Sequence, residues 1–140
     1  MIETHTLEFD TSGENEILNI TRDVQNVLVD SKCDGDGNVL LFLQSTTAGL
    51  TIMEDEEGLF EDFPRTMERV APKRAEYKHE QAWHDGNGHS HMRSAIVGTS
   101  LTIPFSKKKN GLLLGQWQQV VLAEFDVRPR KRSLIVQIQW

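Results

Sequence analysis

The chain has 140 residues, of which 38% are hydrophobic, 15 are Lys or Arg and 21 are Asp or Glu. This length and balance predict one domain, residues 1–140, with a buried core, and they exclude disordered and collagen-like chains. The apolar runs fall short of the roughly 20 residues that cross a bilayer, and the first residues lack a signal pattern, so we expect a soluble cytoplasmic protein with no membrane partner. The single Cys33 excludes an internal disulfide.

The net charge of −6 is distributed unevenly along the chain. Residues 1–103 contain 8 basic and 19 acidic side chains, whereas residues 104–140 contain 7 basic and 2 acidic ones. The chain has no long cationic stripe, and its overall negative sign repels a polyanion, so we expect no nucleic-acid partner. The basic C-terminal part leaves a small phosphorylated molecule open as a partner.

Hydrophobic patterning predicts strands and helices in the first half of the chain. Thr21 is a candidate N-cap because apolar residues follow it at helical spacing. Acidic residues at 54–57 start a second helical pattern, which Pro64 interrupts and Pro72 ends. In order, we expect an edge strand at 2–9, a short strand at 16–20, a helix at 22–31, a turn at 33–38, a strand at 39–44, further sheet at 50–53 and a second helix up to Val70.

The second half is predicted to be a long loop followed by sheet. From Ala75 to Met92 the hydrophobic period is lost and Gly, Asn, Asp and His dominate, which indicates a long loop, or a loop entering a short helix near His91. Tight connections between the later strands favour an antiparallel meander. The predicted fold class is therefore α+β, a mainly antiparallel sheet with two or three helices. The later strands are expected at 99–105, 112–125 and 134–140, with a lysine-rich turn at 106–111 and a basic corner at 128–132.

Four of the five histidines fall within residues 79–91, interleaved with Asp85 and Asn87. Imidazole is a common ligand of zinc and exchanges protons near neutral pH, so this segment is the leading candidate for a functional or metal site. His89 and His91 share a side of an extended segment, but they diverge in a helix. The alternative is a solvated polar loop whose histidines bind backbone groups. We expect the histidines to converge with the hydroxyl-bearing end of the 39–44 strand in one cavity.

Three further features are candidates for ligand contacts. The hydroxyls and amides of residues 45–47, at the end of a buried strand, can hold phosphate oxygens or satisfy their own backbone. The basic run at 128–132 offers guanidinium groups suited to phosphate, or it is an exposed corner. Glu54 is a proton acceptor at a pocket rim, or an ordinary carboxylate at the start of a helix.

Taken together, these segments resemble the YjbQ-like family, small bacterial and archaeal proteins described as secondary thiamine-phosphate synthases. The resemblance covers nearly the whole chain. Its most specific parts are the stretches 42–54 (FLQSTTAGLTIME), 85–93 (DGNGHSHMR), 98–100 (GTS), 115–118 (GQWQ) and 124–126 (EFD).

The resemblance implies an α+β homotrimer with a weak ability to join a pyrimidine diphosphate to a thiazole phosphate and release pyrophosphate. Cationic groups or a metal ion stabilise such a leaving group. The catalytic residues that it implies are His79, His91 and Glu54. A divalent ion, Mg²⁺ or Zn²⁺, is the implied cofactor, with His79, Asp85, His89 and His91 as its ligands. The implied ligand-binding residues are Ser45, Thr46, Thr47, Asn87, Trp117, Gln118 and Arg130.

This chain departs from the family pattern at two positions: Ser45 stands where the family usually has His, and Met53 where it usually has Asn. The loss of a His predicts weaker metal binding, or none. It also favours a second hypothesis, a non-catalytic trimeric protein that binds phosphate or metal. Metal-dependent hydrolysis is a third hypothesis, and it is supported only by the density of histidines.

Overall fold

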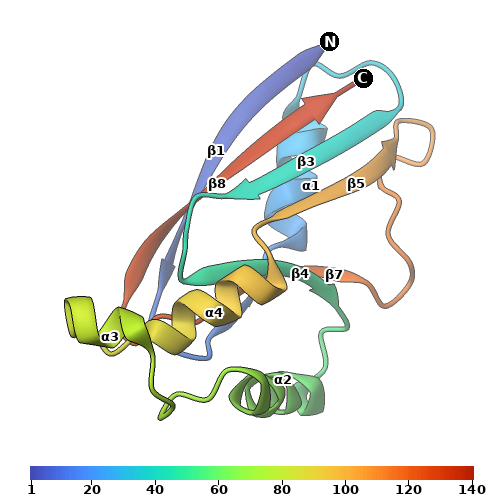
Figure 1. Ribbon diagram of the computed structural model, residues 1–140. Helices are drawn as coiled ribbons and strands as arrows, with labels where there is room; N and C mark the ends of the chain where they lie inside the picture. The colour runs from blue at the N-terminus through green and yellow to red at the C-terminus, as the bar shows by residue number, and fades with distance from the viewer.

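The computed structural model describes residues 1–140 as eight strands and four helices (Figure 1). The strands are β1 (Ile2–Thr11), β2 (Ile17–Asn19), β3 (Gly37–Leu43), β4 (Ala48–Met53), β5 (Ser100–Ser106), β6 (Gly111–Leu112), β7 (Gln119–Glu124) and β8 (Arg130–Gln139). The helices are α1 (Thr21–Asp30), α2 (Glu57–Val70), α3 (Lys78–Trp83) and α4 (Gly88–Val97). None of these helices combines the length and the apolar character needed to cross a membrane.

The strands form two antiparallel sheets. Five strands lie in the order β1-β8-β3-β5-β6, and three lie in the order β2-β7-β4. β1 is the edge strand that its sequence predicts, because it pairs only with β8, which also pairs with β3. The predicted α+β class with mainly antiparallel sheet is confirmed, although the chain has four helices and not two or three.

The main core lies between α1, one face of the five-stranded sheet and the three-stranded sheet. In β8 every second side chain is buried, namely Leu134, Val136 and Ile138, as a strand with one covered face requires. Val24 and Leu28, four residues apart on α1, belong to the same cluster. Burying each such side chain stabilises the fold by about 1.5–3 kcal/mol. α1 lies behind this sheet in Figure 1, and no helix covers the near face.

Two details of the helices differ from the prediction. Thr21 is the first residue of α1 and not its N-cap. Its hydroxyl donates to Asn19 Oδ1 over 2.7 Å and accepts from the Val120 amide over 2.8 Å, so it ties α1 to β7. α2 runs unbroken through Pro64. The helix tolerates this proline because its apolar face packs against Phe125 in a second, smaller core.

The predicted strand at 112–125 is two strands in two different sheets. The chain turns at 115–118, where the Gln118 side chain accepts a hydrogen bond from the Gly115 amide over 2.7 Å. β6 stays in the five-stranded sheet, whereas β7 joins β2 and β4. The predicted meander is therefore wrong, because apolar alternation does not reveal which sheet a strand enters.

The predicted loop at 75–92 is largely helical, since it contains α3 and the start of α4. Only the alternative, a helix that includes His91, is close to the structure. Glu80 fixes the start of α4, because its carboxylate accepts hydrogen bonds from the amides of Gly86 and Gly88, each over 2.6 Å. The buried face of α4 is polar, which explains why hydrophobic periodicity misses this helix. Its buried residues are Gly88, His89, Ser90, Arg93 and Ser94.

Candidate functional site

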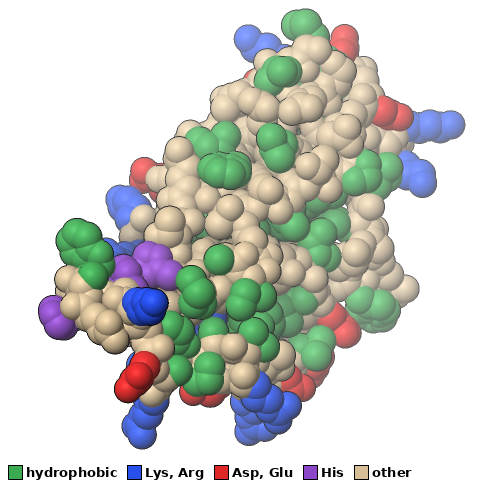
Figure 2. All heavy atoms as spheres, in the orientation of Figure 1, with side chains coloured by type: hydrophobic (Ala, Val, Ile, Leu, Met, Phe, Trp, Pro, Cys, Tyr) green, Lys and Arg blue, Asp and Glu red, His purple; other side chains and the backbone are tan.

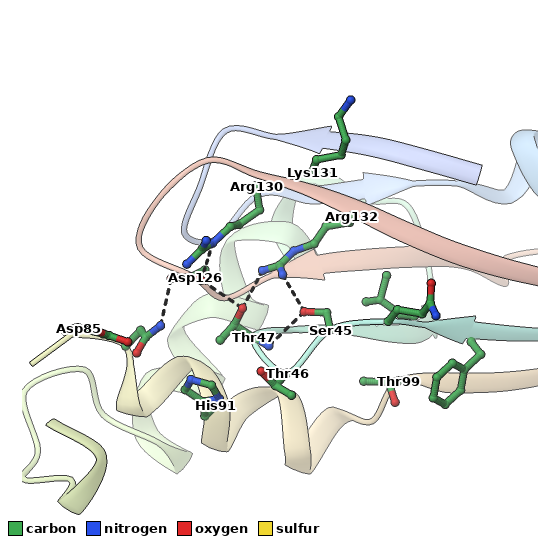
Figure 3. Close-up of a pocket in the computed structure, with 14 residues that line it drawn as sticks. Ser45, Thr46, Thr47, Asp85, His91, Thr99, Asp126, Arg130, Lys131 and Arg132 are labelled. Carbon is green, nitrogen blue, oxygen red and sulfur yellow. Dashed lines mark hydrogen bonds and ion pairs between the residues drawn. The ribbon is translucent and has the colours of Figure 1, made fainter. Parts of the chain in front are cut away.

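A cavity of about 690 Å³ opens where β3 ends, β8 begins and α4 starts (Figure 3). It brings together seven of the residues that the sequence singles out: Ser45, Thr46, Thr47, Asp85, Asn87, His91 and Arg130. The other residues that line it are Phe42, Leu43, Gln44, Thr99, Asp126, Lys131 and Arg132. His91 and Thr46 thus share one cavity, but His91 is the only one of the four clustered histidines that lines it, so the predicted convergence of the histidines holds for one residue.

Arg132 organises the floor of this cavity. It is 7% exposed, and it makes two hydrogen bonds to the fully buried Glu124, from Nε to Oε2 over 2.8 Å and from Nη2 to Oε1 over 2.7 Å. Its Nη1 also donates to Ser45 Oγ over 2.7 Å, and its Nη2 to Thr47 Oγ1 over 2.8 Å. Burial raises the pKa of Glu124, and the contacts with Arg132 oppose that rise. Arg132 therefore holds the two hydroxyls in place.

The Ser45 hydroxyl can act only as a donor toward a ligand. Its oxygen already accepts two hydrogen bonds, one from Arg132 Nη1 and one from the Thr47 amide over 3.1 Å. A hydroxyl has two lone pairs and one proton, so the proton is the remaining hydrogen-bonding group. The Thr47 hydroxyl has no proton left for a ligand, because it already donates to Asp126 Oδ2 over 3.1 Å while it accepts from Arg132. The Thr46 amide makes no hydrogen bond within the chain.

Asp126 positions Arg130 at the edge of the cavity. Arg130 Nε donates to Asp126 Oδ2 over 2.8 Å, while both Nη groups of Arg130 have no acceptor within the chain. Burial on its own raises the pKa of Asp126, but hydrogen bonds from the Val127 amide, Arg130 and Thr47 outweigh burial and hold this pKa below its ordinary value. Arg130 therefore keeps free guanidinium donors in the cavity that the Ser45 hydroxyl also lines.

Lys131 differs from its two basic neighbours. Successive side chains of a strand point to opposite faces. Arg130 and Arg132 accordingly point into the site, whereas Lys131 points away (Figure 3). Its Nζ lies 3.7 Å from Glu8 Oε2 on β1. The basic run is thus divided, with two arginines at the site and one lysine facing solvent.

His79 and His91 form a pair beside the cavity, with ring centroids 4.5 Å apart. His79 Nε2 donates to Asn87 Oδ1 over 3.1 Å and lies 3.8 Å from Asp85 Oδ2. Burial, and then the proximity of His79, lower the pKa of His91 below its ordinary value. With a pKa below 6.5, His91 is mostly neutral at pH 7. Figure 2 shows histidines gathered on this part of the surface, over α3 and α4.

His89 does not join that pair. It lies two positions from His91 on a helix, which directs the two side chains about 200° apart around the axis. His89 is 1% exposed, and its Nε2 donates to Glu14 Oε1 over 2.8 Å. No three His, Cys, Asp or Glu side chains lie close enough together to hold a metal ion. The predicted ligand set of His79, Asp85, His89 and His91 does not converge, so these residues do not fit a metal site in this arrangement.

Three other predicted residues lie away from the cavity. Glu54 and Trp117 line a separate hollow of about 290 Å³, together with Asn19, Asp55, Gln116 and Gln119. The Gln118 side chain stabilises the turn at Gly115. Within one chain, Glu54 therefore has no contact with the histidine pair.

Sequence reasoning missed Arg132, Glu124 and Asp126 as a unit. The sequence contains a signal for this unit. Glu124 and Asp126 lie two residues apart, with the apolar Phe125 between them. Arg130 and Arg132 also lie two residues apart, with the exposed Lys131 between them. Alternate residues share a face of a strand. Two such pairs a few residues apart indicate matched ion pairs, which the structure forms as Arg130–Asp126 and Arg132–Glu124.

Comparisons with known proteins agree on one family. The family described as UPF0047 protein YjbQ-like matches residues 5–140. A UPF0047 protein of Archaeoglobus fulgidus is 37% identical over 131 residues, which cover 94% of this chain and 97% of the relative. UPF0047 protein YugU of Bacillus subtilis is 33% identical, with 95% and 96% covered.

Solved structures show the same fold. A YbjQ-like protein of unknown function from Sulfolobus solfataricus superposes with a TM-score of 0.86 at 25% identity, over 99% of this chain and 98% of that one. The conserved hypothetical protein TT1486 from Thermus thermophilus gives a TM-score of 0.77 at 34% identity, with 95% and 99% covered.

These comparisons correct the predicted activity. The resemblance implied a secondary thiamine-phosphate synthase, but the family description and the relatives' names state no such activity, and the Sulfolobus solfataricus protein is described as of unknown function. The predicted thiamine-phosphate synthase activity is therefore wrong, while the predicted family is confirmed.

Proposed function

This chain belongs to the UPF0047 protein YjbQ-like family, and because that description names no activity, we propose a function from the cavity itself: the protein binds a small phosphorylated molecule there. Three kinds of donor at the cavity support the proposal. They are the free Nη groups of Arg130, the proton of the Ser45 hydroxyl, and the amide and hydroxyl of Thr46.

The observation that carries the proposal is the state of the Ser45 hydroxyl. With both lone pairs occupied by Arg132 and the Thr47 amide, its oxygen is a poor nucleophile, but its proton suits an acceptor. The oxygens of an ionised phosphate group act only as acceptors, and hydrogen bonds to a charged group contribute about 1.5–3 kcal/mol. The Ser45 hydroxyl is therefore better suited to binding an anion than to acting as a nucleophile.

The charges at the cavity favour one phosphate group and not a polyanion. Arg132 is matched by buried Glu124, and Asp126 accepts from only one nitrogen of Arg130. Arg130 therefore provides the one guanidinium with donors left for a ligand, and a guanidinium can hold two phosphate oxygens at once. The lowered pKa of His91 leaves it little positive charge at pH 7.

Calorimetric titration with methyl phosphate at pH 7.5 tests this proposal. We expect Arg130→Gln to weaken binding about tenfold or more, since it removes a charge-assisted contact. Arg128→Gln is the matched control, because Arg128 is an exposed arginine of the same basic run and does not line the cavity. Equal losses in the two variants, or no binding by the native protein, would contradict the proposal.

We further propose that the protein forms the homotrimer that its family resemblance implies. The near face of the five-stranded sheet supports self-association, because no helix covers it (Figure 1) and it carries the apolar side chains of Leu40, Phe42 and Ile135. Exposed apolar faces of this kind mark protein interfaces. Light scattering should give three times the 16.0 kDa mass of one chain. A monomer mass at micromolar concentration would contradict this proposal.

A divalent ion forms no part of the proposal. The sequence predicts Mg²⁺ or Zn²⁺, but only His79 and His91 of the four predicted ligands lie ring to ring, and no set of three ligands is present. Metal binding stays a prediction for direct metal analysis of the purified protein.

A further inference from the structure

A second hollow continues the main cavity along α4. It has a volume of about 380 Å³. Four of its lining residues also line the main cavity, namely Ser45, Thr46, His91 and Thr99. The two hollows are therefore parts of one groove, with the Arg130 donors at one end and the side of α4 at the other.

The α4 end of the groove offers apolar contact and few polar groups. Met92 is 46% exposed there, and Ala95 is also exposed. The Ser94 hydroxyl is already used, because it donates to the Ala48 carbonyl over 2.6 Å. No Lys, Arg, Asp or Glu lines this end, and the one titratable side chain, His91, has a lowered pKa.

The backbone at this end is also satisfied. The Gly98 amide donates to the Ser94 carbonyl over 2.8 Å, and the Gly98 carbonyl accepts from the Leu50 amide over 2.9 Å. A ligand group seated here meets a methionine side chain, an alanine methyl and a glycine, none of which supplies a charge. Such a surface suits a small uncharged, apolar group.

We propose that the ligand is a phosphomonoester with a small apolar body, whose phosphate lies at Arg130 and Ser45 and whose body lies over Met92 and Ala95. This inference rests on the proposed phosphate binding and adds the chemical class of the rest of the ligand. Thr46 and His91 stand between the two ends, because both line the main cavity and its continuation.

Methyl phosphate and phenyl phosphate test the inference, because they share one head group and differ in the apolar body. We expect the native protein to bind phenyl phosphate about tenfold more tightly, since the ring removes apolar surface from water. Met92→Ala should reduce that preference to about threefold and leave the affinity for methyl phosphate unchanged. Ile96→Ala is the matched control, because Ile96 is an exposed apolar residue of the same helix that lines neither hollow.

The outcomes separate the two proposals. If both esters bind with equal affinity, the phosphate site stands and the apolar end is refuted. The same holds if Met92→Ala and Ile96→Ala change the preference equally. If neither ester binds, phosphate binding itself is refuted, and this inference falls with it.

Discussion

Arg132 Nη1 and Ser45 Oγ lie 2.7 Å apart, although 87 positions separate the two residues in the chain. The same guanidinium binds Glu124 through two nitrogens. Arg132 belongs to β8 of the five-stranded sheet, and Glu124 to β7 of the three-stranded sheet. One buried ion pair therefore joins the two sheets and at the same time orients the hydroxyl that faces the ligand.

Removal of Arg132 should destabilise the whole fold. Arg132→Met leaves the fully buried Glu124 carboxylate without its partner, and breaking a buried ion pair from one side costs about 3–5 kcal/mol. Urea unfolding followed by circular dichroism measures this loss. The double variant Arg132→Met with Glu124→Leu removes both charges, and we expect it to recover more than half of the lost stability. A double variant as unstable as the single one would show that the unpaired charge is not the cause.

Sequence reasoning worked where one face of an element is apolar. Leu134, Val136 and Ile138 alternate along β8, and this part of the strand is predicted because the period of two is undisturbed. The strand itself begins at Arg130, inside the predicted basic corner, where polar side chains hide the period. The predicted cavity shared by Thr46 and the clustered histidines is found for His91 alone.

The same reasoning failed where polar contacts decide the structure. α4 buries His89 and Arg93, which bind Glu14 and Glu68, and a helix with a polar core face has no hydrophobic period to detect. The sequence predicts that Glu54 joins the histidines, but Glu54 follows β4 and lines a different hollow. Local patterns identify chemistry, whereas the sheet pairing that brings distant groups together depends on contacts across the whole chain.

The Ser45 proton should contribute directly to phosphate binding. Ser45→Ala removes the donor, and we expect the affinity for methyl phosphate to fall about tenfold, as for a hydrogen bond to a charged group. Ser45→Thr keeps a hydroxyl and should retain most of the affinity. Both variants are compared by calorimetry after their folding is checked by thermal unfolding. Unchanged affinity in Ser45→Ala would show that this hydroxyl has only a structural role.

Glu14 should make stability depend on pH in the acid range. Burial by itself raises the pKa of Glu14, but hydrogen bonds from Lys73 (2.7 Å) and His89 (2.8 Å) outweigh it and lower this pKa below 4.5. Because the folded pKa lies below that of the unfolded chain, this contribution to stability is fully present above about pH 4.5 and is lost as the pH falls through the folded value.

Urea unfolding between pH 3 and pH 7 measures the Glu14 contribution. Glu14→Gln cannot titrate, so we expect its stability to fall less steeply between pH 5 and pH 3 than that of the native protein. Glu16→Gln, at a neighbouring acidic residue, is the control. Identical pH profiles for native protein and Glu14→Gln would refute the role of this carboxylate.

His91 should titrate below its ordinary value of 6.5, and removal of its neighbour should raise its pKa. Burial is the larger cause of the lowered pKa, and repulsion from His79, whose ring centroid is 4.5 Å away, is the next. In His79→Gln the repulsion is absent, so the midpoint of His91 moves upward. Two-dimensional NMR of the imidazole protons between pH 4.5 and 8 follows this titration.

The lowered pKa of His91 also makes stability depend on pH. Since the folded pKa is depressed, the unfolded chain binds more protons at His91, and the native protein gains stability from this residue as the pH rises from the folded to the unfolded pKa. A His91 midpoint at or above 6.5 in the native protein, or one that falls in His79→Gln, would contradict the lowered pKa and its assignment to burial and to His79.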